Sequence, residues 1–437
     1  MFKPLCTLSQ QPLKIVFLSL LLSCTANADE RFIIGVATHL MNKNGSSTKA
    51  LQLLQEAGVD SVRDDAYWSI AEPRRGELHI TPAWRAYLDN AQEHKLRPLL
   101  VLGYGNPNYA NYAKPRVPPV RDAFGNYVKF VSRELTDNVD FYEIWNEWDA
   151  ENPVDPGFSK DYSTLIEDTA SRLKQQKKTV TILAGAVTSL GMDLGFADRL
   201  IETGLLNHVD GLSLHPYVHC RHEERQAPER WIAWLRLIDA DLRALAARPV
   251  PLYLTEMGWP SNVGKCGVSE QTQAAYLARS FFLARTLPNI RGLWWYDLLD
   301  DGSDTGDPEQ NFGLLNQDLT VKPSYLTLKA ISPFLHDYRY DVEKSHELDA
   351  AYLLRFSKGS EQILVAWATG KPRSITVDAS SVQAGNVLLV DSGQPERGQQ
   401  DTGIAWNCND SRCSAQVPIS EFPKIIRLGS KPPLFAQ

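Results

Sequence analysis

The chain has 437 residues, of which 43% are hydrophobic and 22% are charged, the usual balance of a soluble globular protein. This length exceeds one average domain and suits a barrel with a smaller module. The formal net charge of −7 argues against nucleic acid as a partner, because an acidic protein is repelled by phosphate backbones.

The first 28 residues have the pattern of a signal peptide. Lys3 and Lys14 precede the short apolar run Ile15–Leu22, and Ala26–Ala28 is typical of a cleavage site. The run is far shorter than the roughly 20 residues that a membrane-spanning helix needs. We therefore expect export to the periplasm or secretion, with an uncleaved anchor as one alternative. Lipid attachment at Cys24 is a second alternative, which would leave the protein associated with the membrane.

Residues 29–336 alternate between eight short apolar runs and longer segments with helical periodicity. Continuous apolar strands between helices are typical of a parallel sheet covered by helices, and eight such repeats predict an α/β fold, the (β/α)8 or TIM barrel. A doubly wound open sheet is the competing fold, but Ala37–His39 is not the glycine-rich turn that usually follows its first strand. The expected strands are Phe32–Thr38, Val59–Arg63, Pro98–Leu102, Phe141–Trp145, Val180–Ala184, Gly211–Leu214, Leu252–Thr255 and Gly292–Trp295. The expected helices are Thr48–Ala57, Trp84–His94, Arg121–Leu135, Tyr162–Gln175, Ala197–Thr203, Pro228–Ala247, Ser269–Thr286 and Ser324–Leu335.

From about Tyr338 onward the chain changes to short alternating segments separated by Gly, Pro, Asp and Ser. This pattern predicts a small antiparallel β-sandwich domain over residues 337–437. Such a domain could bind glycan or support the barrel, and we favour support. Its expected strands are Ala351–Phe356, Ile363–Ala368, Ser374–Val377, Val387–Val390, Ala415–Val417 and Lys424–Leu428.

Four cysteines remain after signal-peptide removal, and an exported chain meets an oxidising space in which disulfides form. Of the three possible pairings we predict Cys408–Cys413, a tight local loop, together with Cys220–Cys266. The second bond would join the loops after two neighbouring strands. A zinc site is the alternative, but the chain has no close Cys-x-x-Cys, so no metal is expected.

Chemistry in a barrel gathers where strands end. In the fourth run alternation places Glu143, Trp145 and Glu147 on one face, with Glu147 nearest the mouth. A carboxyl beside Trp is partly desolvated, which favours the protonated form that a general acid needs. The seventh run also ends in an acid near an aromatic residue, Glu256 in Thr-Glu-Met-Gly-Trp. Two such acids suit glycoside hydrolysis, where one protonates the leaving oxygen and the other attacks the anomeric carbon or activates water.

These motifs resemble the clan of retaining glycosidases on (β/α)8 barrels, which carry Asn-Glu after strand four and a nucleophilic Glu after strand seven. The resemblance implies Glu147 as acid/base, Glu256 as nucleophile and a glycosyl-enzyme intermediate. Asn146 would hydrogen-bond a sugar hydroxyl. No cofactor is expected, since two carboxyls suffice.

Within the clan the chain most resembles glycoside hydrolase family 39, through Tyr142–Glu147, Leu214–Tyr217 and Thr255–Trp259. In that family it is most similar to bacterial glycosidases encoded with biofilm exopolysaccharide machinery. Family 5 is the runner-up. Trp148 departs from the family pattern, because many members have Pro there, and it could reshape the leaving-group side.

The resemblance also implies roles for residues at other strand ends. Arg63 would pair with the nucleophile, Tyr217 would hydrogen-bond it, His215 would line the site, and Trp295 would form the floor of the −1 subsite. Each has a structural alternative: a pair of Arg63 with a neighbouring aspartate, a buried His215, or a core Trp295. Four further aromatic residues could be sugar platforms or ordinary loop residues: Trp68, Tyr104, Trp259 and Tyr296.

Acidic residues crowd the expected eighth loop and suggest calcium, but their spacing misses the helix-flanked calcium-loop pattern. We expect a solvated acidic loop instead. The residues concerned are Asp297, Asp300, Asp301, Asp304 and Asp307.

The sequence therefore predicts a monomeric retaining glycoside hydrolase whose partner is a polysaccharide outside the cytoplasm, with endo action on a biofilm exopolysaccharide. An exo-acting β-glycosidase of the xylosidase type is the alternative within the class. Long loops after strands three, six and eight could form a groove for a polymer or close a pocket for a chain end. A scaffold that binds polysaccharide without turnover is the alternative from another class, since fold alone does not establish activity.

Overall fold

The computed structural model describes eight ranges of the chain, all from Arg31 onward. The expected signal peptide, with Cys24, lies outside the described residues. No helix in the described ranges combines the length and the apolar character needed to cross a bilayer. The described ranges are 31–43, 48–175, 178–222, 226–348, 350–380, 389–391, 404–409 and 412–430.

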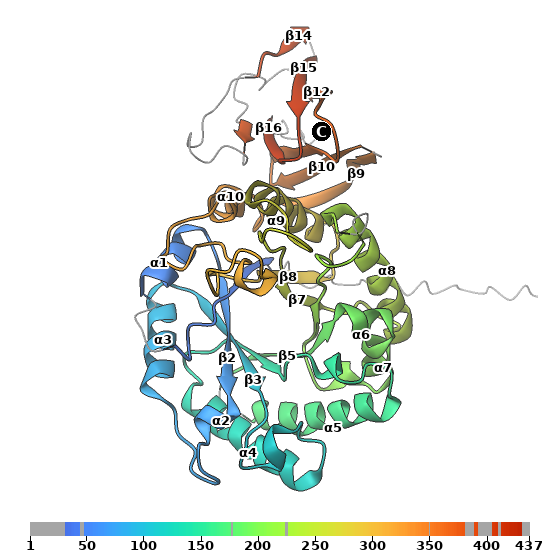
Figure 1. Ribbon diagram of the computed structural model, residues 1–437. Helices are drawn as coiled ribbons and strands as arrows, with labels where there is room; N and C mark the ends of the chain where they lie inside the picture. Colours follow the sequence, from blue (N-terminus) through green and yellow to red (C-terminus); the bar gives the residue numbers. More distant parts are fainter. Residues whose placement is uncertain are drawn as a thin grey trace, which may run out of the picture. The chain divides into compact units, whose positions relative to one another are not determined.

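Eight parallel strands close into a barrel in the order in which they follow one another along the chain, so the predicted barrel is confirmed (Figure 1). The first strand pairs with both the second and the eighth, which closes the sheet. The strands are β1 Ile33–Ala37, β2 Ser61–Tyr67, β3 Arg97–Gly103, β4 Phe141–Ile144, β5 Thr181–Thr188, β6 Gly211–His215, β7 Leu252–Met257 and β8 Ile290–Trp295.

Helices surround the barrel, and their starts follow from local chemistry. In one of them the Thr81 hydroxyl accepts a hydrogen bond from the backbone N–H of Trp84, and Pro82 occupies the first turn, where no N–H is needed. Two short helices that the sequence did not predict, α2 and α6, lie directly after β2 and β5. The helices are α1 Thr48–Glu56, α2 Trp68–Ala71, α3 Pro82–Glu93, α4 Pro118–Glu134, α5 Pro156–Leu173, α6 Ser189–Asp193, α7 Phe196–Glu202, α8 Pro228–Ala246, α9 Glu270–Ala284 and α10 Pro323–Ile331.

The barrel interior changes from apolar to polar along the strands. Phe141 and Tyr253 belong to the apolar cluster that fills the interior. Two residues further along the same strands, Glu143 and Thr255 are polar, buried and hydrogen-bonded to each other. The apolar layer stabilises the barrel, and the polar layer lies on the side of the strand ends, where the candidate site is built.

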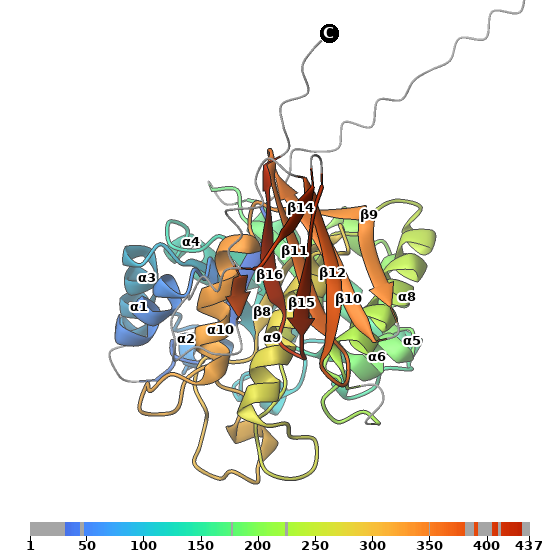
Figure 2. The same ribbon diagram turned by 90° about the horizontal axis from the view of Figure 1, so that it is seen from above.

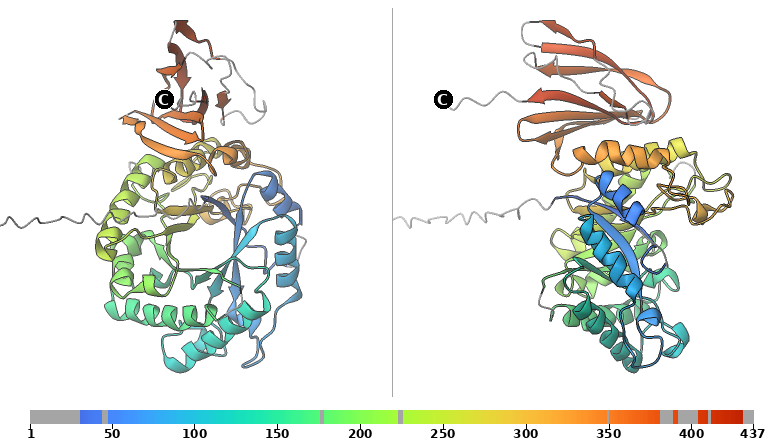
Figure 3. Two further views of the ribbon diagram at one scale, coloured as in Figure 1. Left: turned by 180° about the vertical axis from the view of Figure 1, so that it is seen from behind. Right: turned by 90° about the vertical axis from the view of Figure 1, so that its left-hand side faces the viewer.

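The C-terminal strands form two antiparallel sheets, as predicted (Figure 3). Apolar side chains of both sheets share one core, which includes Leu364, Val377 and Val417. The sequence missed the strand Arg339–Leu348, because its mostly exposed residues show no apolar alternation. The five-stranded sheet has the order β13-β16-β11-β10-β9 and the three-stranded sheet the order β12-β15-β14. Their bounds are β9 Arg339–Leu348, β10 Ala351–Lys358, β11 Glu361–Ala368, β12 Arg373–Ser380, β13 Leu389–Asp391, β14 Asn407–Asn409, β15 Arg412–Ile419 and β16 Lys424–Ser430.

The larger sheet packs on the barrel helices without a break in the core (Figure 2). The Phe356 ring of β10 lies 5.7 Å from the Phe282 ring of α9. The indole N–H of Trp367 donates to Oε1 of Glu229 in α8 at 2.7 Å, and Arg279 of α9 donates to the same oxygen at 2.7 Å. These contacts agree with a supporting role for the sheet, and the predicted boundary between residues 336 and 337 stays a prediction.

Both predicted disulfides form. Cys220 pairs with Cys266, which joins the loop after β6 to the loop after β7. Cys408 pairs with Cys413 across the β14–β15 pair.

Candidate active site

Glu147 reaches the mouth of the barrel through a break in strand geometry. Strand β4 ends at Ile144, and both Trp145 and Glu147 adopt positive φ values, 65° and 44°. The alternation expected from the sequence therefore stops. The predicted alternation is wrong for Trp145, whose buried ring packs against the ring of Phe124 in α4 at 5.7 Å. The Glu147 side chain stays 31% exposed, so a substrate can reach it.

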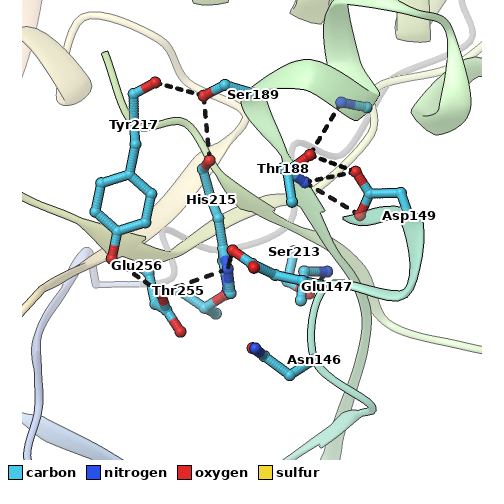
Figure 4. A network of polar contacts seen from close by, with 12 residues as sticks. Asn146, Glu147, Asp149, Thr188, Ser189, Ser213, His215, Tyr217, Thr255 and Glu256 are labelled. Atoms are coloured by element: carbon cyan, nitrogen blue, oxygen red, sulfur yellow. Dashed lines mark hydrogen bonds and ion pairs between the residues drawn. The ribbon is translucent and has the colours of Figure 1, made fainter. Parts of the chain in front are cut away.

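Glu256 also departs from strict alternation. The pairing of β7 with β8 is irregular between Leu254 and Met257. Such irregularities re-aim side chains, and here Thr255 and Glu256, although adjacent, both take part in the polar network of the site (Figure 4). The buried Glu256 accepts a hydrogen bond from the Tyr217 hydroxyl at 2.9 Å, the contact that the sequence predicted for this tyrosine.

The Arg63 guanidinium joins three side chains, two from β4 and the loop after it and one from β7. Its Nε donates to Glu143 at 2.8 Å, its Nη1 to Glu256 at 2.6 Å, and its Nη2 to Oδ1 of Asn146 at 2.9 Å. Burial alone would lower the pKa of Arg63, but Glu143 and Glu256 raise it well above its ordinary value, so the guanidinium stays charged. Arg63 therefore does not pair only with a neighbouring aspartate, which was the structural alternative.

His215 lies between the two candidate catalytic acids. Its Nδ1 is 3.0 Å from Oε1 of Glu147 and 3.5 Å from Oε2 of Glu256. Its Nε2 is 3.2 Å from Oγ1 of Thr255, which donates to Oε1 of Glu143 at 2.7 Å. The ring is fully buried, so these side chains supply its polar contacts (Figure 4).

The charges around Glu256 keep it ionised. Burial raises the pKa of Glu256, but His215, Arg63 and the Tyr217 hydroxyl together lower it below its ordinary value. Burial likewise lowers the pKa of His215, yet Glu256 and Glu147 raise it overall. The arrangement thus pairs an ionised carboxylate with a second carboxyl group that shares hydrogen bonding with an imidazole.

Glu147, His215 and Glu256 also form the one grouping among the described residues that could bring three metal-ligating side chains together. Their ligand atoms lie within 4.8 Å of one another. The Arg63 guanidinium, 2.6 Å from Glu256, opposes a second positive charge at this point. The donor set therefore fits acid–base chemistry better than a resident metal.

A second polar group at the mouth was not predicted. Asp65, two residues after Arg63 on β2, lies near the hydroxyls of Tyr104 and Tyr67, at 3.3 and 3.4 Å. Burial raises the pKa of Asp65. The period of two along β2 was a usable signal, because it places Arg63, Asp65 and Tyr67 on one side of the strand. Of the predicted sugar platforms, Tyr104 is the one that belongs to this group.

Three other predicted sugar-binding rings are 0% exposed: Trp68, Trp259 and Trp295. The indole of Trp68 donates to Glu72 at 2.6 Å, and that of Trp259 donates to the carbonyl of Gln226 at 2.9 Å. The Trp68 ring stacks on Tyr109 and Tyr127. The Trp259 ring packs against Trp231, Tyr276 and Trp295, so neither of these two rings presents a face to a sugar. Trp295 does end β8, but the floor of the −1 subsite stays a prediction.

Trp148, the departure from the family pattern, is buried in the protein, and its effect on the leaving-group side stays a prediction. Its ring is fully buried, stacks on Tyr162 of α5 at 5.0 Å and donates to the carbonyl of Phe158.

The acidic loop after β8 is held by its own contacts. Asp300 forms an ion pair with Lys322 at 2.9 Å, and Asp301 forms one with Lys43 at 3.3 Å. Asp307 caps the short turn Pro308–Gln310. These three acids therefore have partners within the protein, whereas the sequence predicted a solvated acidic loop. Asp297 differs, since burial raises its pKa well above its ordinary value.

The fold and this site together define a (β/α)8 barrel protein in which a glutamate after the fourth strand and a glutamate at the end of the seventh strand converge. Neither a protein-family model nor a curated protein matches the sequence. Solved structures do match, and they include a family 39 glycoside hydrolase from Bacteroides cellulosilyticus, with a TM-score of 0.75 and 24% identity over 92% of this chain and 81% of that chain. The resemblance to family 39 that the sequence predicted is thus confirmed as a likeness of fold.

Two further structures show how widely the fold is shared. A monomeric β-xylosidase from Caulobacter crescentus matches with a TM-score of 0.60 and 16% identity, over 92% of this chain and 96% of that chain. A family 5 enzyme from Streptomyces cattleya matches with a TM-score of 0.56 and 17% identity, over 69% of this chain and 80% of that chain. At these identities the likeness concerns the fold, and the function has to be argued from the site.

Proposed function

We propose that the protein is a retaining glycoside hydrolase in which Glu256 is the nucleophile and Glu147 the acid/base. The observation that carries this proposal is the short separation of the two side chains, because one carboxylate oxygen of Glu147 lies within 4.8 Å of one carboxylate oxygen of Glu256. Retaining enzymes hold their two carboxyl groups about 5–5.5 Å apart, whereas inverting enzymes need about 6.5–9.5 Å to admit a water molecule.

In the first step a Glu256 oxygen attacks the anomeric carbon and forms an ester bond. The bond from that carbon to the leaving oxygen breaks, and the leaving oxygen takes a proton from Glu147. In the second step water attacks the same carbon, its proton passes to Glu147, and the ester bond to Glu256 breaks. Two displacements restore the original anomeric configuration and regenerate both carboxyl groups.

The surrounding residues prepare each partner for its role. Arg63 and Tyr217 each donate to one oxygen of Glu256, which keeps this carboxylate ionised and oriented. Arg63 also donates to Oδ1 of Asn146, so the Nδ2 donor of that amide points away from Arg63 and, as far as the described residues go, is left for a sugar hydroxyl.

The proposed substrate is a polysaccharide outside the cytoplasm, and the proposed mode is endo action on a biofilm exopolysaccharide. The two disulfides support an oxidising location. The exposed Tyr112 supports a polymer, because its ring is 58% exposed on the loop after β3 and its carbonyl lies against Gly105, next to Tyr104 of the mouth. An exposed ring there suits stacking on a sugar beyond the cleaved bond. The fold likeness to a β-xylosidase keeps exo action as the alternative.

The test is to incubate the mature protein with exopolysaccharides and with aryl xylosides, glucosides, mannosides and galactosides, then size the products and record the first-formed anomer by NMR. Glu256→Gln and Glu147→Gln should each lower turnover by orders of magnitude. Glu151→Gln is the matched control, because Glu151 lies four residues after Glu147 on the same loop and its side chain is 65% exposed.

Oligosaccharide products with retained configuration would support the proposal, and their lengths would separate endo from exo action. Tyr112→Ala should weaken cleavage of long substrates and spare aryl glycosides. A first product of inverted configuration would overturn the retaining mechanism. Unchanged substrate across the panel would favour the scaffold that binds without turnover.

A further inference from the structure

The two candidate catalytic acids are joined by a continuous set of hydrogen bonds beneath the site. It runs from Glu147 to His215, from His215 to Thr255, from Thr255 to Glu143, and through Arg63 to Glu256. Thr255 and Glu143 are fully buried, and the mechanism above assigns them no role. Their position suggests one, because the direction of each bond can be worked out.

Glu143 can only accept. The charged guanidinium of Arg63 donates to its Oε2 at 2.8 Å, which favours the carboxylate form, and a carboxylate has no proton to give. The bond between Glu143 and Thr255, at 2.7 Å, must therefore use the hydroxyl proton of Thr255. A hydroxyl has a single proton, so Oγ1 of Thr255 can only accept from its remaining neighbour, Nε2 of His215 at 3.2 Å.

We propose that Thr255 and Glu143 are positioning residues that hold the proton of neutral His215 on Nε2, so that Nδ1 presents a lone pair to Glu147. The contact between Nδ1 and Oε1 of Glu147, at 3.0 Å, then needs one proton, and that is the acid proton that Glu147 delivers to the leaving oxygen. If Glu147 lost this proton, its carboxylate would face the lone pair of Nδ1 of His215, and the two would repel each other. The geometry therefore helps the acid/base to keep its proton until the leaving group takes it. The inference rests on the proposed glycosidase function.

Other charged groups face the pair from several elements, and none replaces Thr255. Glu256 of β7 and Arg63 of β2 act on His215, and Tyr217 lies beside Glu256. Asp149, which follows Glu147, is bound to Thr188, and Glu309 of the loop after β8 interacts with Glu147 through charge. Glu256 and Glu147 raise the pKa of His215, so the contact between Nδ1 and Glu147 keeps its one proton to higher pH. Thr255 alone contacts Nε2 among the described residues and so decides which nitrogen of the neutral ring carries the proton.

The test compares Thr255→Val, which removes the hydroxyl, with Thr255→Ser, which retains it. In the valine variant His215 is free to move its proton to Nδ1 and donate to ionised Glu147, which stabilises the deprotonated pair. The value of kcat/KM should then fall at least 10-fold more for phenyl than for 2,4-dinitrophenyl glycosides of the best sugar in the panel, because dinitrophenolate needs no acid. The basic limb of the pH profile should move down by about one pH unit. Thr255→Ser, which keeps the hydroxyl, should show the leaving-group dependence and the pH profile of the wild type.

Nitrogen NMR of histidine labelled with nitrogen-15 tests the same point in the wild-type protein without a measurement of activity. The chain has 9 histidines, and comparison with His215→Gln identifies the signals of His215. At high pH the neutral ring should carry its proton on Nε2 in the wild type. A proton on Nδ1 would overturn the proposal, as would equal losses for both aryl leaving groups in Thr255→Val. A wild type with the Nε2 form but no hydrolysis of any glycoside would instead count against the proposed function alone.

Discussion

The Nη1 atom of Arg63 lies 2.6 Å from Oε1 of Glu256, and both side chains are buried. The same guanidinium also holds Glu143 and Asn146, so one side chain from β2 sets the positions of groups from β4 and β7. Lysine could replace its charge but not its planar set of donors.

Arg63→Lys should therefore lower kcat/KM by about 100-fold, because a nucleophile displaced by about 1 Å reacts that much more slowly. The acidic limb of the pH profile should stay near its wild-type position, since the positive charge remains. Arg63→Gln should in addition move this limb to higher pH, because Arg63 lowers the pKa of Glu256 and its loss lets that pKa rise. Steady-state kinetics over pH on an aryl glycoside checks both, and wild-type kcat/KM in Arg63→Lys would refute the positioning role.

The disulfide Cys220–Cys266 closes a segment with a sequence separation of 46 and lies three residues after Tyr217. Replacing both cysteines by serine should lower the free energy of unfolding by about 4 kcal/mol on the chain-entropy model. It should also lower kcat/KM several-fold, because the loop that carries Tyr217 is then no longer covalently joined to the loop after β7. Chemical denaturation and kinetics measure the two effects.

The matched control is Cys408–Cys413, whose sequence separation is 5. Its double serine variant should lose only about 2 kcal/mol and keep wild-type kcat/KM. Equal kinetic effects of the two double variants would mean that the first disulfide has no specific link to the site.

His219 should make the protein less stable as the pH falls. Burial lowers its pKa to about 4, and its buried Nδ1 has no hydrogen-bond partner among the described residues. Below the ordinary histidine pKa of about 6.5 the unfolded chain takes up a proton that the folded chain refuses, so stability is lost as the pH falls from about 6.5 to about 4. At pH 5 the loss from this residue should be about 2 kcal/mol relative to pH 7.5.

His219→Phe removes this titration and keeps a ring between Tyr217 and Phe312. Urea unfolding at the two pH values should show a smaller difference in the variant than in the wild type. The same difference in both proteins would show that other groups cause the acid sensitivity.

Trp367 of β11 tests whether the larger sheet supports the barrel. Its buried ring lies in the core shared with the barrel helices, and its indole N–H donates to Glu229 of α8. Trp367→Ala should cost about 3–5 kcal/mol and Trp367→Phe about 1–2 kcal/mol, because the second variant loses mainly the hydrogen bond. Differential scanning calorimetry should show a single transition that both variants shift. Two transitions, of which only one moved, would mean that the sheets and the barrel are independent domains.

Much of the architecture was predictable because its causes are local. The eight barrel strands appear as apolar runs in the sequence, and the helices between them show their own periodicity. The strand Arg339–Leu348 was missed because an exposed edge strand leaves no apolar pattern in the sequence. The pairing of Cys220 with Cys266 followed from the order of neighbouring strands alone.

By itself the sequence determined the barrel and the two glutamates at the ends of its fourth and seventh strands. Only the tertiary structure decided how their side chains and those of their neighbours lie. The positive φ of Glu147 and the irregular pairing before Met257 break the alternation on which the sequence prediction relied. The burial of Trp68 and Trp259 depends on segments far along the chain, which no local pattern records. The bond from Thr255 to Glu143 spans 112 residues, so it exists only once the barrel has closed.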